Sequence, residues 1–334
     1  MSMRSDRRMD AADRGQTRSS SLPAPVRRPP GRPGDRGPRD AGEWSGVPWA
    51  GVLGATGIAI AGTALAVRLA LGRQARIARR RIGKPLGEDA VPADRVWRPR
   101  LAGDPVDLLL LGDSLAAGLG APRRKDTLGG RLAKGLARRL HRPVRLRTVA
   151  IVGSESTDLD TQLASLETDY LPHVAVIVVG GNDVTHRIPV SLSVQHLEDA
   201  IGWLHALGAG VVVGTCPDLG ALRPVPQPLR AIASRMSRRL AAAQAQAAIE
   251  HGATAVDLRR AVGTMFFDEP EEMFSLDRFH PSALGYRRTA EALLPAVAAA
   301  AEETLAEDTL AEGSAAAADR RSSVTAEPLG APTR

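Results

Sequence analysis

The chain has 334 residues, a formal net charge of +7 at pH 7 and a single cysteine. One cysteine excludes an internal disulfide framework. Phe, Trp and Tyr make up only 3% of the residues, which argues against a protein that stacks single-stranded nucleic-acid bases. The excess arginine lies in the first 46 residues and just after residue 72, where basic residues more often meet anionic lipid headgroups than nucleic acid, so we expect no nucleic-acid partner.

The first hundred residues differ in composition from the rest of the chain. Residues 1–46 are rich in Arg, Pro, Gly and Ser and are predicted to form a disordered basic leader. Residues 49–67 carry no charge and are long enough to cross a hydrocarbon core of ~30 Å, so a single transmembrane anchor is predicted within 47–71. A buried soluble helix and a cleaved signal peptide are the alternatives. Residues 72–104 are predicted as a basic juxtamembrane linker.

From residue 105 onward, apolar runs alternate with segments of helical character. Strands are predicted at 106–112, 144–153, 174–180, 210–215 and 253–258. Helices are predicted near 127–141, 156–169, 192–207, 228–250 and 282–302. This alternation is typical of a parallel sheet with helices on both faces. Residues 301–334, rich in Ala, Glu and Ser, are predicted as a disordered tail.

The first predicted strand ends abruptly at Gly112-Asp113-Ser114. Open α/β sheets bind ligands at the carboxyl ends of their strands. A serine in the first turn of the following helix lies beside free backbone N–H groups and the positive end of the helix dipole. The position therefore suits Ser114 as a nucleophile, although the tripeptide alone is more typical of an ordinary helix N-cap.

Two further strand ends carry candidate donors for an oxyanion hole. The second strand ends at Gly153, which can present its backbone N–H closely to a substrate. The third ends at Gly180 and is followed by Asn182, whose side-chain amide is also a donor. Each has an ordinary alternative, namely a turn glycine in the first case and a turn asparagine before an N-capping Asp183 in the second.

Near the carboxyl end, Asp277 stands three residues before His280, which Pro281 follows. A serine nucleophile needs a base, and the base needs an acid on its other ring nitrogen, so the two side chains can form this pair within one loop. A structural histidine is the alternative. The remaining histidines show no metal-binding pattern, so neither a metal nor an organic cofactor is expected; they are His141, His173, His186, His196, His205 and His251.

These four segments, in this order, resemble the SGNH (GDSL) hydrolase family, in the form of an actinobacterial membrane-anchored or exported enzyme. The resemblance covers about 106–300 and implies a three-layer α/β/α flavodoxin-like sandwich with a five-stranded parallel sheet, the hydrolase domain being 105–300. It implies a catalytic triad of Ser114, Asp277 and His280. It also implies an oxyanion hole formed by Ser114, Gly153 and Asn182, of which the glycine block matches least well.

The resemblance implies a serine esterase or lipase that hydrolyses short- to medium-chain acyl esters through an acyl-enzyme on Ser114. Its substrate would be a small acyl ester, a lipid or an acylated glycan. An acyltransferase acting on an envelope lipid or glycan with the same triad, and a non-catalytic membrane-tethered binding module, are the alternatives. The sequence does not indicate an oligomeric state.

The location of the enzyme is predicted from conflicting signals. The dense basic cluster at 73–84 follows the predicted membrane span at 49–67 and favours a cytoplasmic hydrolase domain. The resemblance to exported hydrolases and the basic amino-terminal arm favour the opposite orientation. We therefore expect a single-pass protein of the cell membrane with an extracytoplasmic catalytic domain.

The walls of the substrate pocket are predicted from the loops that follow the strands, at 115–126, 154–158, 184–190 and 217–228. The last of these is long and proline-rich, and long connections often carry function. Residues 123–125 are all basic and either attract an anionic substrate or form an ordinary solvated loop.

Overall fold

The computed structural model describes the backbone of residues 49–324 and the side chains of residues 61–311. The predicted leader at 1–46 and the last part of the predicted tail, 325–334, lie outside the described residues. The chain divides into two units, Met1–Thr56 and Gly57–Arg334, and the sheet with its covering helices belongs to the second unit.

Six strands form one sheet in the described part of the chain. They are β1 (Arg95–Trp97), β2 (Val106–Gly112), β3 (Val144–Thr148), β4 (Val174–Val178), β5 (Gly210–Gly214) and β6 (Thr254–Val256). Their order across the sheet is β1-β3-β2-β4-β5-β6. Strands β2 to β6 are the five predicted strands; they are parallel and follow the flavodoxin order.

The sixth strand, β1, corrects the predicted five-stranded sheet. It pairs antiparallel with β3 at the sheet edge, with Val96 opposite Arg145. Three residues are too few to show the alternation by which a strand is recognised in a sequence. For that reason β1 was not distinguished from the predicted linker at 72–104.

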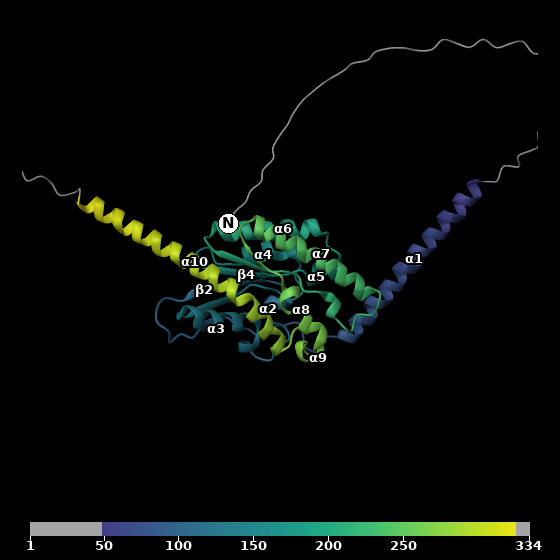
Figure 1. Ribbon diagram of the computed structural model, residues 1–334, viewed down its shortest axis with the longest axis horizontal. Helices are drawn as coiled ribbons and strands as arrows, with labels where there is room; N and C mark the ends of the chain where they lie inside the picture. Colours follow the sequence, from purple (N-terminus) through teal and green to yellow (C-terminus); the bar gives the residue numbers. More distant parts are fainter. Residues whose placement is uncertain (1–48, 325–334) are drawn as a thin grey trace, which may run out of the picture. The chain divides into compact units, whose positions relative to one another are not determined.

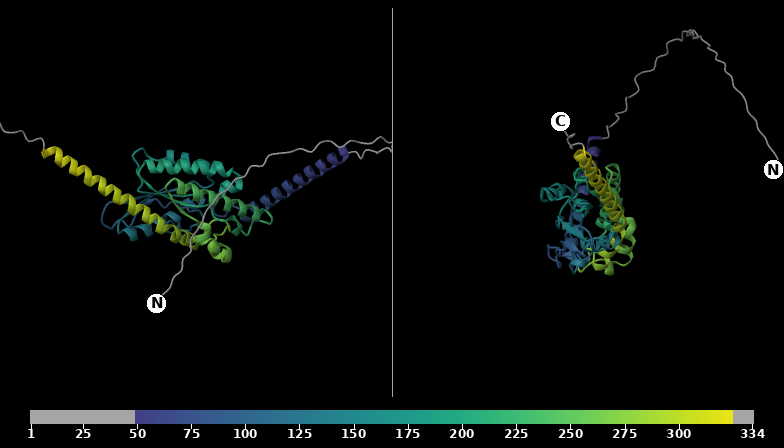
Figure 2. Two further views of the ribbon diagram at one scale, coloured as in Figure 1. Left: turned by 45° about the horizontal axis from the view of Figure 1, so that its top comes forward. Right: turned by 90° about the vertical axis from the view of Figure 1, so that its left-hand side faces the viewer.

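Helices cover both faces of the sheet (Figures 1 and 2). On one face lie α3 (Leu128–Leu140), α8 (Leu258–Asp268) and α10 (Ala283–Val324). On the other lie α4 (Leu159–Ala164), α6 (Val190–Ala206) and α7 (Leu229–Glu250). Successive leucines of β2 alternate between the two clusters, and all are fully buried, which explains the continuous apolar run in the sequence.

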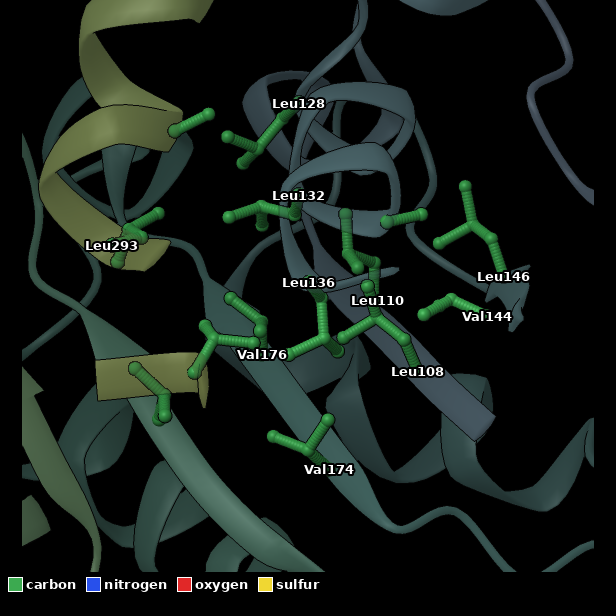
Figure 3. Packing of buried hydrophobic residues seen from close by; sticks show 14 of the residues in the cluster. Leu108, Leu110, Leu128, Leu132, Leu136, Val144, Leu146, Val174, Val176 and Leu293 are labelled. Atoms are coloured by element: carbon green, nitrogen blue, oxygen red, sulfur yellow. The ribbon is translucent and has the colours of Figure 1, made fainter. Parts of the chain in front are cut away.

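Helix α3 packs one apolar face onto the sheet, as Figure 3 shows. Leu128, Leu132 and Leu136 repeat at four-residue intervals and lie against Leu110 of β2 and Leu293 of α10. Burying each leucine contributes about 1.5–3 kcal/mol. The packing of α3 and α10 against β2 thus holds this strand, and with it its carboxyl end, in place.

Short elements connect these helices and strands. They are α2 (Ser114–Ala117), η1 (Arg124–Asp126), η2 (Ser156–Asp158), α5 (Gly181–His186), η3 (Leu219–Ala221) and α9 (Pro270–Met273). The helix predicted at 156–169 is instead η2 followed by the short α4. Helices α5, α8 and α9 were not predicted, because each is short or carries a weak apolar pattern.

Helix α1 (Trp49–Ile82) extends beyond the predicted anchor, so residues 72–82 of the predicted linker are helical. The Gln74 side chain donates to Gln227 O at 2.8 Å and accepts from Leu229 N at 3.0 Å. Among the described residues, no helix combines the length and the apolar character needed to cross a membrane. The side chains of 49–60, which make up most of the predicted span, lie outside the described residues.

At the other end, α10 continues to Val324, which corrects the predicted start of a disordered tail at 301. Ala301 and Thr304 are buried, and Leu305 packs against the core beneath α3 and α10. Alanine has the highest intrinsic helix propensity, so an alanine-rich segment extends a helix without showing an apolar stripe. Composition alone therefore gave the wrong structure for 301–324.

Candidate active site

Ser114 is the first residue of α2 and directly follows β2, as the sequence predicts. Asp113 caps this helix by accepting from Leu115 N at 2.9 Å. Gly112 has φ +128°, and a Cβ there would lie 1.9 Å from Val178 O, so only glycine allows this approach to β4. The serine is consequently placed at the carboxyl end of a central strand.

Asp277 and His280 lie in the loop between α9 and α10. One Asp277 oxygen accepts from the backbone N–H groups of Phe279 and His280, both at 3.0 Å. Its other oxygen lies 2.6 Å from His280 Nδ1, and His280 Nε2 lies 2.9 Å from Ser114 Oγ. The fold thus brings the three predicted triad residues into one hydrogen-bonded chain.

The environment of Asp277 favours the ionised form of its carboxyl group. Burial by itself raises the pKa of Asp277, but the hydrogen bonds from the His280 side chain and from the backbone of Phe279 and His280 outweigh it and lower the pKa. The ionised carboxylate accepts a hydrogen bond from His280 Nδ1–H, which leaves Nε2 free to accept one from the serine hydroxyl. The arrangement can therefore activate Ser114 as a nucleophile.

The candidate oxyanion donors lie on neighbouring loops. Asn182 is the second residue of α5, and its amide donates to Ser154 O at 2.9 Å, which uses one of its two hydrogens. Gly153 directly precedes Ser154 in the chain. Its backbone has φ +93°, and a Cβ added to it would meet no atom within 4 Å. Gly181 N donates to the Asp113 carboxylate at 3.3 Å, which ties α5 to the segment that carries Ser114.

Two buried polar side chains, whose role here the sequence does not predict, hold these loops together. Asp183 accepts from Ser156 N at 3.1 and 3.2 Å and from Ser193 Oγ at 2.6 Å. It lies inside α5, where Gly180 is the N-cap, so the predicted alternative of an N-capping Asp183 is wrong.

The second of these side chains is Gln162 of α4. It accepts from Gly112 N and donates to Gly112 O, both at 2.9 Å, and it donates to Ser154 Oγ at 3.1 Å. It therefore joins the end of β2 to the loop that follows β3. No local motif marks Gln162, since its role depends on atoms that lie far away in the sequence.

An apolar pocket opens beside Ser114 and His280. Its cavity is narrow, about 80 Å³, and its apolar lining includes Leu219, Leu222, Val262, Phe266, Phe274 and Phe279. The predicted loop 217–228 contributes to the wall, whereas the predicted segments 154–158 and 184–190 do not. Helix α8 supplies much of the remainder, and no predicted pocket loop includes it.

Comparisons with known proteins place the chain in a family. Residues 110–288, more than half of the chain, match the GDSL-like Lipase/Acylhydrolase family. The chain is 41% identical over 210 residues to the GDSL-like esterase Rv1075c of Mycobacterium tuberculosis, covering 63% of this chain and 67% of that protein.

Two solved structures show a more distant similarity. The crystal structure of TesA is 24% identical with a TM-score of 0.46, covering 58% of this chain and 99% of that one. A catalytic mutant of Axe2, an acetylxylan esterase from Geobacillus stearothermophilus, is 19% identical with a TM-score of 0.47. The match covers 59% of this chain and 95% of that one. The assignment rests on the two sequence matches: the chain belongs to the GDSL-like lipase/acylhydrolase family and is a carboxylic ester hydrolase.

Proposed function

We propose that this chain is a serine esterase that hydrolyses short- to medium-chain acyl esters through an acyl-enzyme on Ser114. The observation that carries the proposal is the hydrogen-bonded chain from Asp277 through His280 to Ser114, with distances of 2.6 and 2.9 Å. A nucleophile, a base and an orienting acid in contact are the arrangement that acyl transfer through a serine requires.

The reaction proceeds in two half-reactions. His280 Nε2 takes the hydroxyl proton as Ser114 Oγ attacks the ester carbonyl, and the resulting oxyanion accepts hydrogen bonds from the N–H groups of Ser114 and Gly153 and from the Asn182 amide. His280 then gives its proton to the departing alcohol, which leaves the acyl group on Ser114. In the second half-reaction water attacks the acyl group, with His280 again taking and returning a proton.

The apolar pocket beside the triad supports an acyl chain of limited length. Its wall is formed by aliphatic and aromatic side chains, including Leu222, Val262 and Phe266, which favour a hydrocarbon chain over a polar group. A cavity of about 80 Å³ is narrow, so long chains lose part of their contacts to the protein.

The test compares the wild type with Ser114→Ala on p-nitrophenyl esters from acetyl to palmitoyl. We expect the variant to lose on the order of 10⁶ in kcat, and the wild type to favour acyl chains of short to medium length. Ser191→Ala, an exposed serine of α6, is the matched control and should leave kcat unchanged. A Ser114→Ala variant with wild-type activity, or a folded wild type that hydrolyses none of the esters, would contradict the proposal.

We also propose that residues 49–67 anchor the enzyme in the cell membrane with the catalytic domain outside the cytoplasm. The support is the uncharged run in the sequence, which is long enough to span ~30 Å as a helix. The test is carbonate extraction of membranes from cells that express the full chain, followed by protease treatment of spheroplasts. Extraction of the chain into the soluble fraction would overturn the anchor, and protection from protease would overturn the orientation.

A further inference from the structure

A second hollow, separate from the apolar pocket, lies between α3 and α10 beside η1. Its cavity of about 400 Å³ shares no lining residue with the pocket at Ser114. Its lining includes the cationic side chains Lys125, Arg131, Lys134, Arg138 and Arg287. Only two acids, Asp126 and Glu291, face them. We call this hollow the basic groove.

The pattern of α3 produces the basic groove. Its leucines are turned onto the sheet and α10, as Figure 3 shows. Arg131, Lys134 and Arg138 repeat at intervals of three and four residues, so they share a different face of the same helix. Arg287, from the first turns of α10, adds its charge from the opposite wall.

The positive charge of the groove is not neutralised within the described residues. Asp126 is paired with Arg131 at 2.8 Å, and Glu291 is paired at 2.9 Å with Arg288, which does not line the groove. Among the described residues, no ion pair or hydrogen bond engages the side chains of Lys125, Lys134, Arg138 and Arg287. Like charges gathered in a hollow repel one another, and a bound anion removes that repulsion.

Arg131, which lines the groove, carries an unused donor. Its Nη2 donates to Asp126 Oδ1 at 2.8 Å and to Ala283 O at 2.9 Å, so the guanidinium is held in place. Its Nε is buried and has no hydrogen-bond partner. Buried donors without a partner are rare in folded proteins, and a bound water or ion is one way in which such a donor is satisfied.

We propose that the basic groove is an anion site that binds a phosphate group. A fixed guanidinium surrounded by flexible lysine and arginine side chains is a donor set that suits the several oxygens of a phosphate. The phosphate can belong to a free phosphate compound or to an anionic lipid headgroup, since both present the same group to these side chains.

The test uses the full-length protein and the double variant Lys134→Ala/Arg138→Ala. Alanine preserves the helix, so α3 is retained while two charges are removed. The control is Arg238→Ala/Arg239→Ala, which removes two exposed charges from α7. Esterase activity on an acetyl ester checks that all three proteins are folded.

Two probes distinguish the sources of the phosphate, both at low ionic strength, where screening is weak. Inorganic phosphate is titrated calorimetrically, and vesicles of phosphatidylglycerol are compared with vesicles of phosphatidylcholine by flotation. We expect the groove variant to bind at least tenfold more weakly than the wild type to one probe or both, and the control to bind like the wild type. A loss for inorganic phosphate alone assigns the site to free phosphate compounds, and a loss of preference for phosphatidylglycerol alone assigns it to a headgroup.

Three outcomes would overturn the proposal. The first is a wild type that neither binds inorganic phosphate nor prefers phosphatidylglycerol. The second is a groove variant that binds as tightly as the wild type. The third is an equal loss in the groove variant and the α7 control, which would show that only the net charge of the molecule matters.

Discussion

Asp113 and Asp277 both lie next to the pair formed by Ser114 and His280, yet their environments act on them in opposite directions. Asp277 receives hydrogen bonds from His280 and from backbone N–H groups, which lower its pKa despite burial. Asp113 is buried with fewer compensating bonds, from Leu115 N and Gly181 N, and its burial raises its pKa to about 6. The two carboxyl groups therefore titrate in different pH ranges.

The raised pKa of Asp113 predicts a pH-dependent stability. Because the folded state holds this proton more tightly than the unfolded state, its contribution to stability is largest below pH ~4 and declines until about pH 6. Asp113→Asn removes this titration. The free energy of unfolding of the wild type should thus fall relative to the variant by about 2 kcal/mol between pH 4 and 7. Urea unfolding at each pH measures it, and a difference that stays constant with pH would refute the assignment.

Gly153 offers a test of the oxyanion hole with a matched control. Gly153→Ala meets no steric clash but places a Cβ at φ +93°, a strain of about 1–2 kcal/mol that shifts the backbone N–H. We expect kcat to fall at least tenfold with little change in KM, because the donor serves the transition state. Gly208→Ala has a similar φ of +79° and equally open surroundings away from the site, so it should keep full kcat. Equal losses in both variants would remove Gly153 from the site.

Ser114, Asp277 and His280 could be identified from the sequence because each belongs to a short local pattern. Ser114 lies where a strand ends and a helix begins, and Asp277 and His280 lie in one loop of four residues. Each feature can be recognised from consecutive residues alone. Gln162 and Asp183 could not, since their partners Gly112, Ser154 and Ser156 come from other segments and only the packed fold brings them together. The candidate triad is thus easier to predict than the buried groups that position the loops around it.

At the scale of elements, Asp183 joins η2, α5 and α6 and so fixes the loops of Gly153 and Asn182 relative to each other. Asp183→Asn replaces one of the two acceptor oxygens by an NH2 group, which removes one of the hydrogen bonds accepted from Ser156 N and Ser193 Oγ. We expect a loss of about 1–3 kcal/mol in stability, from urea unfolding, together with a lower kcat. Asp199→Asn, an exposed position on α6, is the control and should change neither. An Asp183→Asn variant with normal kcat would show that the loops are held by other contacts.

Helix α8 forms a wall of the apolar pocket and contains Gly263, where an added Cβ meets only Arg259 carbons at 3.6 and 4.0 Å. Gly263→Leu therefore fits the helix and fills the pocket. We expect activity on octanoyl and longer p-nitrophenyl esters to fall at least tenfold, while activity on the acetyl ester is retained. Gly263→Ala, with a smaller side chain, should give an intermediate profile. An unchanged chain-length profile would place the acyl chain elsewhere.

Elements that are buried on every face were predictable from the sequence, and elements that are only partly buried were harder to predict. Strands β2 and β4 are buried on both faces and show as unbroken apolar runs. By contrast, α8 buries only Leu258 and Val262 within eleven residues, so its sequence carries little of the helical period. Its contribution to the pocket wall was missed for the same reason.

At the scale of the whole molecule, the composition of the first hundred residues divided the chain into leader, anchor and linker, but residues 72–82 belong to a helix with specific contacts. Ala78 is buried in a cluster with Leu222 and Val225, and Gln74 binds the backbone of Gln227 and Leu229. A stretch dominated by arginine is predicted as a linker because it has too few apolar residues to show the helical period of hydrophobicity. The contacts depend on the loop 217–228, which the local sequence does not reveal.

This predicts that the carboxyl-terminal half of α1 stabilises the hydrolase domain. A chain that begins at residue 84 lacks the Gln74 hydrogen bonds and the burial of Ala78, which together contribute about 1–3 kcal/mol. Compared with a chain that begins at residue 61, its melting temperature should be lower by about 2–10 °C. Gln74→Ala in the longer chain should give part of this decrease, whereas Gln246→Ala, at an exposed glutamine of α7 that donates to Glu250, should give little. Equal melting temperatures for the two chains would mean that residues 72–82 act as the linker that their composition predicts.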